Sequence, residues 1–181
     1  MSWRLKKTVV MVGMMGAGKT AVGTQLARML SVPFVDSDEE IVKAANMSIA
    51  EIFERDGEPF FRRKEAQVIG RLLHGRAGIL STGGGAFLQE ANRTLIASEG
   101  VSVWLKADID LLWTRVRHKT NRPLLRTNDP RATLTALYEA RVPSYALADL
   151  TVEARAEYSV EAMAEQVIAT LQTRPDVLER K

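Results

Sequence analysis

The segment 13–20, GMMGAGKT, is the feature that most constrains the fold of this chain. It matches the phosphate-binding pattern GxxxxGK(S/T), in which backbone N–H groups surround an anion, a lysine reaches the β and γ phosphates, and a hydroxyl contacts Mg²⁺. Such a loop works between a strand and a helix, because the positive end of the helix dipole attracts phosphate. The β-branched run 8–12 precedes it, and Val22, Leu26 and Leu30 follow on one helical face. The segment therefore predicts a nucleotide-binding strand, loop and helix.

Five short apolar runs are separated by helix-like stretches along the chain. They span residues 8–12, 33–35, 78–81, 101–105 and 150–152. This alternation is typical of a parallel sheet covered by helices on both faces. We predict an α/β fold with a three-layer, doubly wound, five-stranded parallel sheet. In such sheets ligands bind at the carboxyl ends of the strands.

Length and composition narrow the class of protein. A chain of 181 residues with 46% hydrophobic content can bury one core, so we expect a single domain over 1–181. It has no cysteine, which excludes disulfides and thiolate metal sites, and its net charge of +3 is weak for nucleic-acid binding. The apolar run ending at Val12 is too short for a signal-peptide core. We expect a cytoplasmic protein with no membrane partner, and we interpret Trp3 and the tail 173–181 as solvated ends.

Two carboxylates follow the second apolar run. Asp36 and Asp38 stand where a strand is expected to end, and a pair of this kind could serve Mg²⁺ and a substrate hydroxyl. Helix capping is the alternative, with Ser37 and Glu40 forming a capping box. That box accounts for the acids of the first turn but leaves Asp36 unexplained. Both interpretations stay open on spacing alone.

Three further sets of residues allow a structural and a functional interpretation. Arg62 and Glu65, at i and i+3, could form a solvated ion pair, or Glu65 could orient Arg62 to grip a substrate carboxylate. The glycines at 83–85 follow the third run, where they form either a flexible loop or a close approach to a ligand. Arg141 lies on an apolar helical face, where it either snorkels at the core edge or clamps an anion.

The segment 115–126 is strongly basic. Its cations are Arg115, Arg117, Lys119, Arg122 and Arg126. Such a run could be solvated, or it could bind RNA, although it has no aromatic residue to stack on bases. Between two helices of a phosphate-binding protein it also suits a mobile lid, over about 117–129, that brings a cation onto the transferring phosphoryl group.

Taken together, these segments resemble the shikimate kinases. The shared motifs are GMMGAGKT at 13–20, DSD at 36–38, FRRKE at 61–65, GGG at 83–85, RPLL at 122–125 and RVPSY at 141–145. The resemblance covers about residues 6–172. It implies a P-loop NTPase fold like that of nucleoside monophosphate kinases. It also implies ATP- and Mg²⁺-dependent phosphorylation of the 3-hydroxyl of shikimate, in the route to chorismate and the aromatic amino acids.

The resemblance also implies a role for each matching residue. The expected catalytic residues are Asp38, at the reacting hydroxyl, Lys19, and Arg122 as the lid cation. The acceptor would be held by Asp38, Arg62, Gly83, Gly84, Gly85 and Arg141, with Glu65 orienting Arg62. ATP would contact Gly13, Gly16, Ala17, Gly18, Lys19, Thr20, Ala21, Arg115 and Arg122, with Arg115 against the adenine. Mg²⁺ would be held by Thr20 and, through water, by Asp36. We expect a monomer with no nucleic-acid partner.

Two positions depart from the family pattern. Ala21 stands where a second hydroxyl is common, and Val160 stands where a proline is common. The segment 153–160 would border the adenine, so the second departure falls where the base would be selected.

Three other classes of function share the phosphate-binding loop. A GTP-dependent switch needs a DxxG segment and an NKxD-type guanine selector, and the chain has neither. A nucleotide-dependent RNA-binding module would rest on the basic segment alone. Another small-molecule kinase, for gluconate or a nucleoside monophosphate, is the nearest rival. Asp38 with two arginines suits a hydroxylated carboxylate better than a nucleobase.

Overall fold

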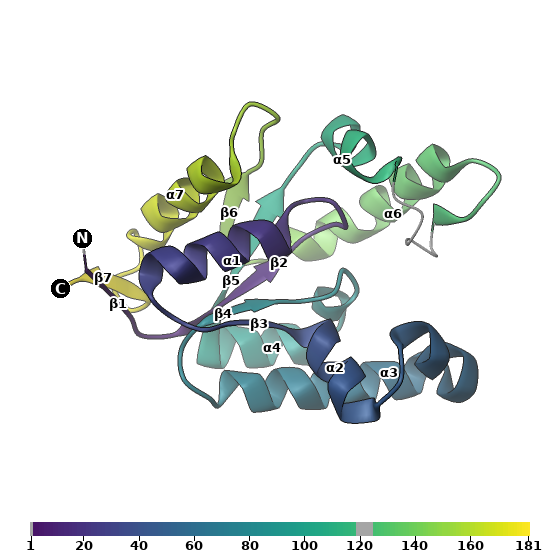
Figure 1. Cartoon of the computed structure of the whole chain (residues 1–181), viewed down its shortest axis with the longest axis horizontal. Coiled ribbons are helices and arrows are strands. Elements are labelled where there is room, and N and C mark those ends of the chain that lie inside the picture. Colours follow the sequence, from purple (N-terminus) through teal and green to yellow (C-terminus); the bar gives the residue numbers. More distant parts are fainter. Residues whose placement is uncertain (1, 119–124) are drawn as a thin grey trace.

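A five-stranded parallel sheet forms the centre of the computed structural model, which describes residues 2–118 and 125–181. The strands are β2 (Thr8–Val12), β3 (Phe34–Asp36), β4 (Ile79–Ser81), β5 (Gly100–Lys106) and β6 (Leu150–Glu153). Their order is β3-β4-β2-β5-β6 (Figure 1). In the central strand, Val9 pairs with Ile79 on one side and with Val101 on the other. The predicted α/β fold with a five-stranded parallel sheet is therefore confirmed.

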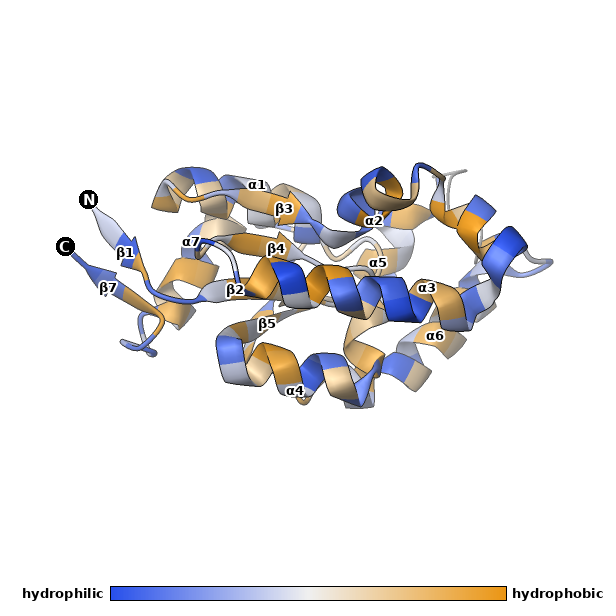
Figure 2. Ribbon diagram, turned by 90° about the horizontal axis from the view of Figure 1, so that it is seen from below, coloured by the Kyte–Doolittle hydropathy of each residue, from blue (hydrophilic) through white to orange (hydrophobic). Residues whose placement is uncertain are grey.

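Helices cover both faces of this sheet (Figures 1 and 2). On one face α1 (Lys19–Leu30) packs against α7 (Val160–Leu171), and on the other α3 (Ile49–Leu73) packs against α4 (Glu90–Glu99). The remaining helices are α2 (Ser37–Ala45), the short 3₁₀ helix η1 (Ala86–Leu88), α5 (Ile109–Val116) and α6 (Pro130–Tyr145). Within the described ranges, no helix is long and apolar enough to cross a membrane.

The main core lies between the sheet and these helices. Val9, Val10, Met11 and Val12 of β2 have no exposed surface, as their β-branched and apolar run leads one to expect. Figure 2 shows apolar strands enclosed by helices with one apolar face each. Removing this surface from water is the main force that fixes the layers. Because β3, β4 and β2 are parallel neighbours, the segments that follow them leave the sheet side by side, at the edge formed by the carboxyl ends of the strands.

A second, smaller core joins α2 to α3. It contains Ile41, Ile52, Phe61 and Val68. Helix α3 is bent at Gly57, whose φ of 82° lies in the left-handed region that a non-glycine residue rarely adopts. The bend changes the direction of the chain just before Arg62, so the second half of the helix can run back beside the sheet edge.

The two ends of the chain form an element that the sequence analysis missed. Strand β1 (Trp3–Leu5) pairs antiparallel with β7 (Leu178–Arg180), with Trp3 opposite Arg180. Leu178 is 2% exposed, and its neighbour Val177 is fully buried. The interpretation of both ends as solvated is therefore wrong. Each strand is three residues long, and such short runs become recognisable only when the partner strand is known.

Candidate active site

The loop between β2 and α1 has the geometry expected of a phosphate-binding loop. Gly16 and Gly18 have φ of 83° and 98°, in the region that glycine adopts without strain. The chain can therefore turn sharply, and α1 begins at Lys19 directly after the loop. The ammonium group of Lys19 donates hydrogen bonds to the carbonyl oxygens of Gly13, at 2.7 Å, and Met14, at 3.0 Å. Its charge thus lies over the loop, where the phosphates of a nucleotide would be held.

Helix α5 supports this loop from outside. Nη1 of Arg115 donates hydrogen bonds to the carbonyl oxygens of Gly16, at 3.0 Å, and Ala17, at 3.2 Å. A Cβ at Gly16 would lie 2.7 Å from Cγ1 of Val116, so the helix packs directly on the glycine. Arg115 therefore has a structural partner here, and its expected contact with adenine stays a prediction.

Asp36 caps the helix that follows β3. Its Oδ1 accepts hydrogen bonds from the backbone N–H groups of Asp38, at 2.8 Å, and Glu39, at 3.3 Å. The expected capping box of Ser37 and Glu40 is wrong, because β3 extends to Asp36 and the helix already includes Ser37. Asp36 has the extended backbone that an N-cap requires.

Thr20 and Asp36 have the donor chemistry that suits Mg²⁺. Thr20 is exposed in the first turn of α1, and only one carboxylate oxygen of Asp36 is used in capping. Mg²⁺ typically takes one or two protein oxygens and completes its shell with water and phosphate. Among the described residues there is no group of three or more His, Cys, Asp or Glu side chains that could hold a metal ion.

Asp38 lies at the centre of the site. Burial raises the pKa of its carboxyl group, as does the charge of Asp36 to a smaller extent, while the cations of Lys19 and Arg62 lower it. Its Oδ1 is buried and accepts no hydrogen bond from the described residues. A Cβ at Gly83 would lie 2.9 Å from each carboxylate oxygen, so the backbone passes directly against the carboxyl group. Asp38 is thus a carboxylate with unused acceptor capacity between two cations.

Arg62 is held by two carboxylates of its own helix. Its Nη1 donates to Glu65 at 3.0 Å and its Nη2 to Glu58 at 3.3 Å. The Glu65 side chain is only 1% exposed, which excludes the solvated ion pair as the meaning of this spacing. Burial raises the pKa of Glu65, and the charge and hydrogen bond of Arg62 oppose that rise. The sequence analysis missed Glu58, although its i, i+4 spacing to Arg62 was a usable signal.

Each of the three consecutive glycines lies against one charged side chain. Gly83 adjoins Asp38, and a Cβ at Gly84 would lie 2.7 Å from Nη1 of Arg141. A Cβ at Gly85 would lie 2.6 Å from Nη1 of Arg62. A side chain at any of these three positions would require the charged group beside it to move, which favours the close-approach interpretation over a flexible loop. The structure thus brings Asp38, Arg62 and Arg141 together around the loop after β4.

Tyr145 is a further residue of this site, to which the sequence analysis gave no role beyond its place in the motif 141–145. Its hydroxyl donates a hydrogen bond to the carbonyl oxygen of Gly84 at 2.6 Å. Its place four residues after Arg141 put it on the same helical face. Nothing in the spacing indicated that the phenol reaches a loop 61 residues away.

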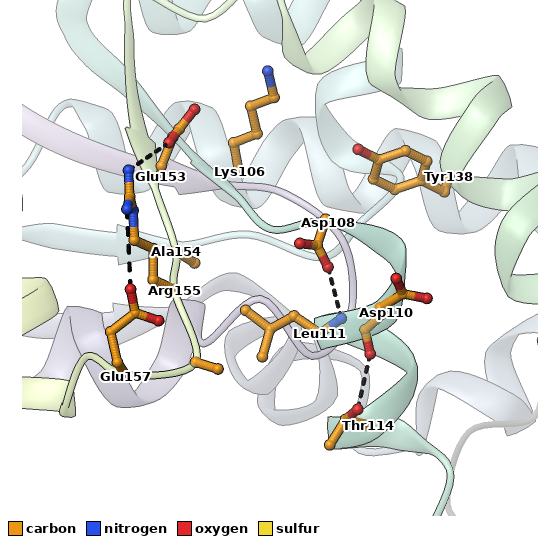
Figure 3. A pocket seen from close by; sticks show the side chains of 11 residues that line it. Lys106, Asp108, Asp110, Leu111, Thr114, Tyr138, Glu153, Ala154, Arg155 and Glu157 are labelled. Atoms are coloured by element: carbon orange, nitrogen blue, oxygen red, sulfur yellow. Dashed lines mark hydrogen bonds and ion pairs between the residues drawn. The ribbon is translucent and has the colours of Figure 1, made fainter.

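Part of the expected nucleotide site lies outside the described residues. This part is the stretch 119–124, which includes Arg122 and belongs to the expected mobile lid over about 117–129. A hollow of about 600 Å³ has walls that include Lys106 of β5, Tyr138 of α6 and the stretch 154–157 after β6. Figure 3 shows the side chains that line it. Arg115 is not among its lining residues. That the segment 153–160 borders adenine therefore stays a prediction.

Comparisons with known proteins agree on one family. The family model described as "Shikimate kinase" matches residues 15–172. A shikimate kinase of Ruegeria pomeroyi is 70% identical over 175 residues, covering 97% of this chain and 90% of that protein. One of Cereibacter sphaeroides is 70% identical over 176 residues, covering 97% and 88%. The solved structure of shikimate kinase from Acinetobacter baumannii in complex with shikimate has a TM-score of 0.86 at 36% identity, covering 92% of this chain and 93% of that one.

Proposed function

Because this chain belongs to the shikimate kinase family and phosphorylates the 3-hydroxyl of shikimate with ATP, we propose that the residues around Asp38 bind the acceptor and that the loop 13–20 binds ATP. The observation that carries the assignment is the Asp38 carboxylate. It is largely buried, lies between the cations of Lys19 and Arg62, and has an oxygen that accepts no hydrogen bond from the residues that the structure describes. A buried acceptor of this kind calls for a donor, and a substrate hydroxyl supplies one.

The acceptor side of the site suits a hydroxylated carboxylate. Arg62, fixed by Glu58 and Glu65, and Arg141, lying against Gly84, present two guanidinium groups to the same loop. Guanidinium groups bind carboxylates in a two-pronged manner, so either arginine can hold the carboxylate of shikimate. The raised pKa of Asp38 makes this group a better proton acceptor for the reacting hydroxyl than an ordinary aspartate.

The donor side neutralises phosphate charge. Lys19 at the start of α1 and the N–H groups of the loop would hold the β and γ phosphates, and Arg122 would serve as the lid cation over them. Thr20 and, through water, Asp36 would hold Mg²⁺. When bound, the metal ion neutralises charge that develops on the phosphate oxygens. We also infer a monomeric, cytoplasmic enzyme of a single domain with no nucleic-acid partner, and the match of one family model over residues 15–172 supports the single domain.

The test of this function is ADP release from ATP with a panel of acceptors. We expect release with shikimate and Mg²⁺, and only background release with quinate, gluconate, a nucleoside monophosphate or no acceptor. Chelation of Mg²⁺ should abolish the rate. Release without any acceptor, or a preference for gluconate or a nucleotide, would contradict the assignments of Asp38, Arg62 and Arg141.

Substitution of Gly85 should weaken acceptor binding specifically. In Gly85→Ala the new methyl group would lie 2.6 Å from Nη1 and 2.8 Å from Cζ of Arg62, so the guanidinium must move. We expect the Michaelis constant for shikimate to rise about tenfold or more, which corresponds to the loss of roughly one charge-assisted hydrogen bond. The constant for ATP should change little.

Gly70→Ala provides the matched control for this variant. Gly70 lies on the same helix as Arg62, and a Cβ there would make only an ordinary contact of 3.5 Å with Leu95. The Michaelis constants for shikimate and ATP of both variants are measured by steady-state kinetics, and thermal unfolding shows whether each variant is folded. An unchanged constant for shikimate in Gly85→Ala would show that Arg62 does not bind the acceptor.

A further inference from the structure

Tyr145 connects the core of the protein to the glycine loop. It is the last residue of α6 and has no exposed surface. The Trp104 ring of β5 lies 6.1 Å away, centroid to centroid, and is 5% exposed. The phenol is thus held on one side by the core, while its hydroxyl bonds to the carbonyl oxygen of Gly84 at 2.6 Å. A phenylalanine would fill nearly the same volume, so the function of the hydroxyl must be sought at Gly84.

The hydrogen bond fixes a peptide plane in the acceptor site. In a trans peptide the carbonyl of one residue and the N–H of the next point in opposite directions. Since the carbonyl of Gly84 points to Tyr145 in the core, the N–H of Gly85 points away from the core. Arg62 lies close to Gly85, and none of the described residues accepts a hydrogen bond from this N–H. The hydrogen bond from Tyr145 therefore leaves the N–H of Gly85 as a fixed donor, directed to the side of the loop where a ligand can approach.

The same hydrogen bond keeps Gly84 against Arg141. Tyr145 and Arg141 are one helical turn apart, and Nη1 of Arg141 lies 2.7 Å from the position of a Cβ on Gly84. Arg141 is also close enough to the phenol for its charge to counteract the rise that burial causes in the pKa of Tyr145. One turn of α6 thus holds both the loop and one of the two arginines, so that their relative position does not depend on the flexibility of the glycines.

We propose that Tyr145 is a positioning residue for the acceptor, which holds the Gly84–Gly85 peptide so that the N–H of Gly85 and the guanidinium of Arg141 both face bound shikimate. The proposal rests on the proposed function of this site. Burial raises the pKa of the phenol, so it remains a hydrogen-bond donor throughout the range in which the enzyme would be assayed.

Tyr145→Phe tests this role, because it removes only the hydroxyl. We expect the dissociation constant and the Michaelis constant for shikimate to rise about three- to tenfold, as for the loss of one hydrogen bond. The turnover number and the Michaelis constant for ATP should change less than about twofold, since the phosphate-binding loop keeps its own contacts. A lower unfolding temperature with unchanged shikimate binding would mean that the hydroxyl serves the core only, and would overturn the proposal.

Tyr138→Phe is the matched control. Tyr138 lies two turns earlier on α6, is only partly buried, and its hydroxyl makes no hydrogen bond with the described part of the chain. Because Tyr138 also lines the hollow of Figure 3, only its constants for shikimate serve as the control, and these should remain those of the wild type. If Tyr138→Phe weakens shikimate binding as much as Tyr145→Phe does, the effect belongs to the helix and not to the contact with Gly84.

Two further measurements separate this proposal from the function itself. Calorimetry of wild-type protein with shikimate comes first, since no binding there refutes the function, whereas equal binding by wild type and Tyr145→Phe refutes only the role of the hydroxyl. Amide hydrogen exchange of Gly85 in the wild type requires no variant to fold. We expect this N–H to exchange quickly without shikimate and to be protected with it. Unchanged exchange in the saturated complex would overturn the proposal.

Discussion

Asp38→Asn should lower the turnover number with shikimate by about 10²- to 10⁴-fold, the range for loss of a positioned acid–base group. The amide keeps the shape of the carboxylate but can no longer accept a proton from the reacting hydroxyl. ATP affinity should change less than about threefold, because the phosphate contacts proposed for ATP belong to the loop and to Lys19, which keeps its hydrogen bonds there. Turnover under saturating substrates and ATP binding by calorimetry are the measurements.

The pH profile of the same variant gives an independent check. A base must be deprotonated to act, so wild-type activity should fall as the pH drops through the raised pKa of Asp38. Asp38→Asn should lose this part of the acid limb. Burial also raises the pKa of Glu65. The titration of Glu65 can therefore still lower the activity of this variant at acid pH. Glu39→Gln, an exposed neighbour on α2, should keep the wild-type rate and profile. Equal losses of ATP affinity and turnover in Asp38→Asn would contradict a role for Asp38 at the hydroxyl.

Lys19→Met should reduce turnover by about 10²- to 10³-fold, as does the removal of one group that stabilises developing charge. The methionine retains most of the stem but lacks the ammonium that lies over the loop. ATP affinity should also fall, which distinguishes this variant from Asp38→Asn. The free energy of unfolding should fall by only about 1–2 kcal/mol, because the hydrogen bonds to Gly13 and Met14 lie at the partly exposed loop.

Arg28→Met serves as the control for Lys19→Met. Arg28 is an exposed cation near the other end of α1, where it donates a hydrogen bond to Gln25 at 3.2 Å. Loss of its charge should leave both turnover and ATP affinity unchanged. If Lys19→Met retains wild-type turnover while Arg28→Met does too, the loop 13–20 does not act on the γ phosphate in the way proposed.

The sequence predicted the strands well because each is encoded locally. The run 8–12 is buried throughout and is rich in β-branched residues. Because both of its faces lie against apolar helices, apolar and polar residues do not need to alternate along it. The prediction was weaker where a long-range partner decides the structure. Strands β1 and β7 are three residues each and exist because they pair with one another. The Asp36 cap was misassigned because the end of β3 is set by pairing with β4, with Asp36 opposite Ser81.

The residues of the candidate site were found from motifs, but their mutual positions were not. The order β3-β4-β2 brings Asp38, the glycine loop and Lys19 to one edge, although they are separated by up to 66 positions along the chain. The sequence left open whether Arg62 and Glu65 form a solvated ion pair. Because the Glu65 side chain is buried in the structure, it is a fixed support for Arg62. Glu58 and Tyr145 joined the site only once the fold was known.

The sequence by itself determined the phosphate-binding loop, the α/β class and the residue types available for catalysis. These depend on local chemistry: the conformational freedom of glycine, the periodicity of apolar residues and the charge of single side chains. Only the tertiary structure decided which side chain lies against each of Gly83, Gly84 and Gly85. It also decided that the hydroxyl of Tyr145 bonds to the carbonyl oxygen of Gly84 in this loop. Such contacts join segments far apart in the chain, and their geometry follows from the packing of whole elements against a common core, which no local pattern encodes.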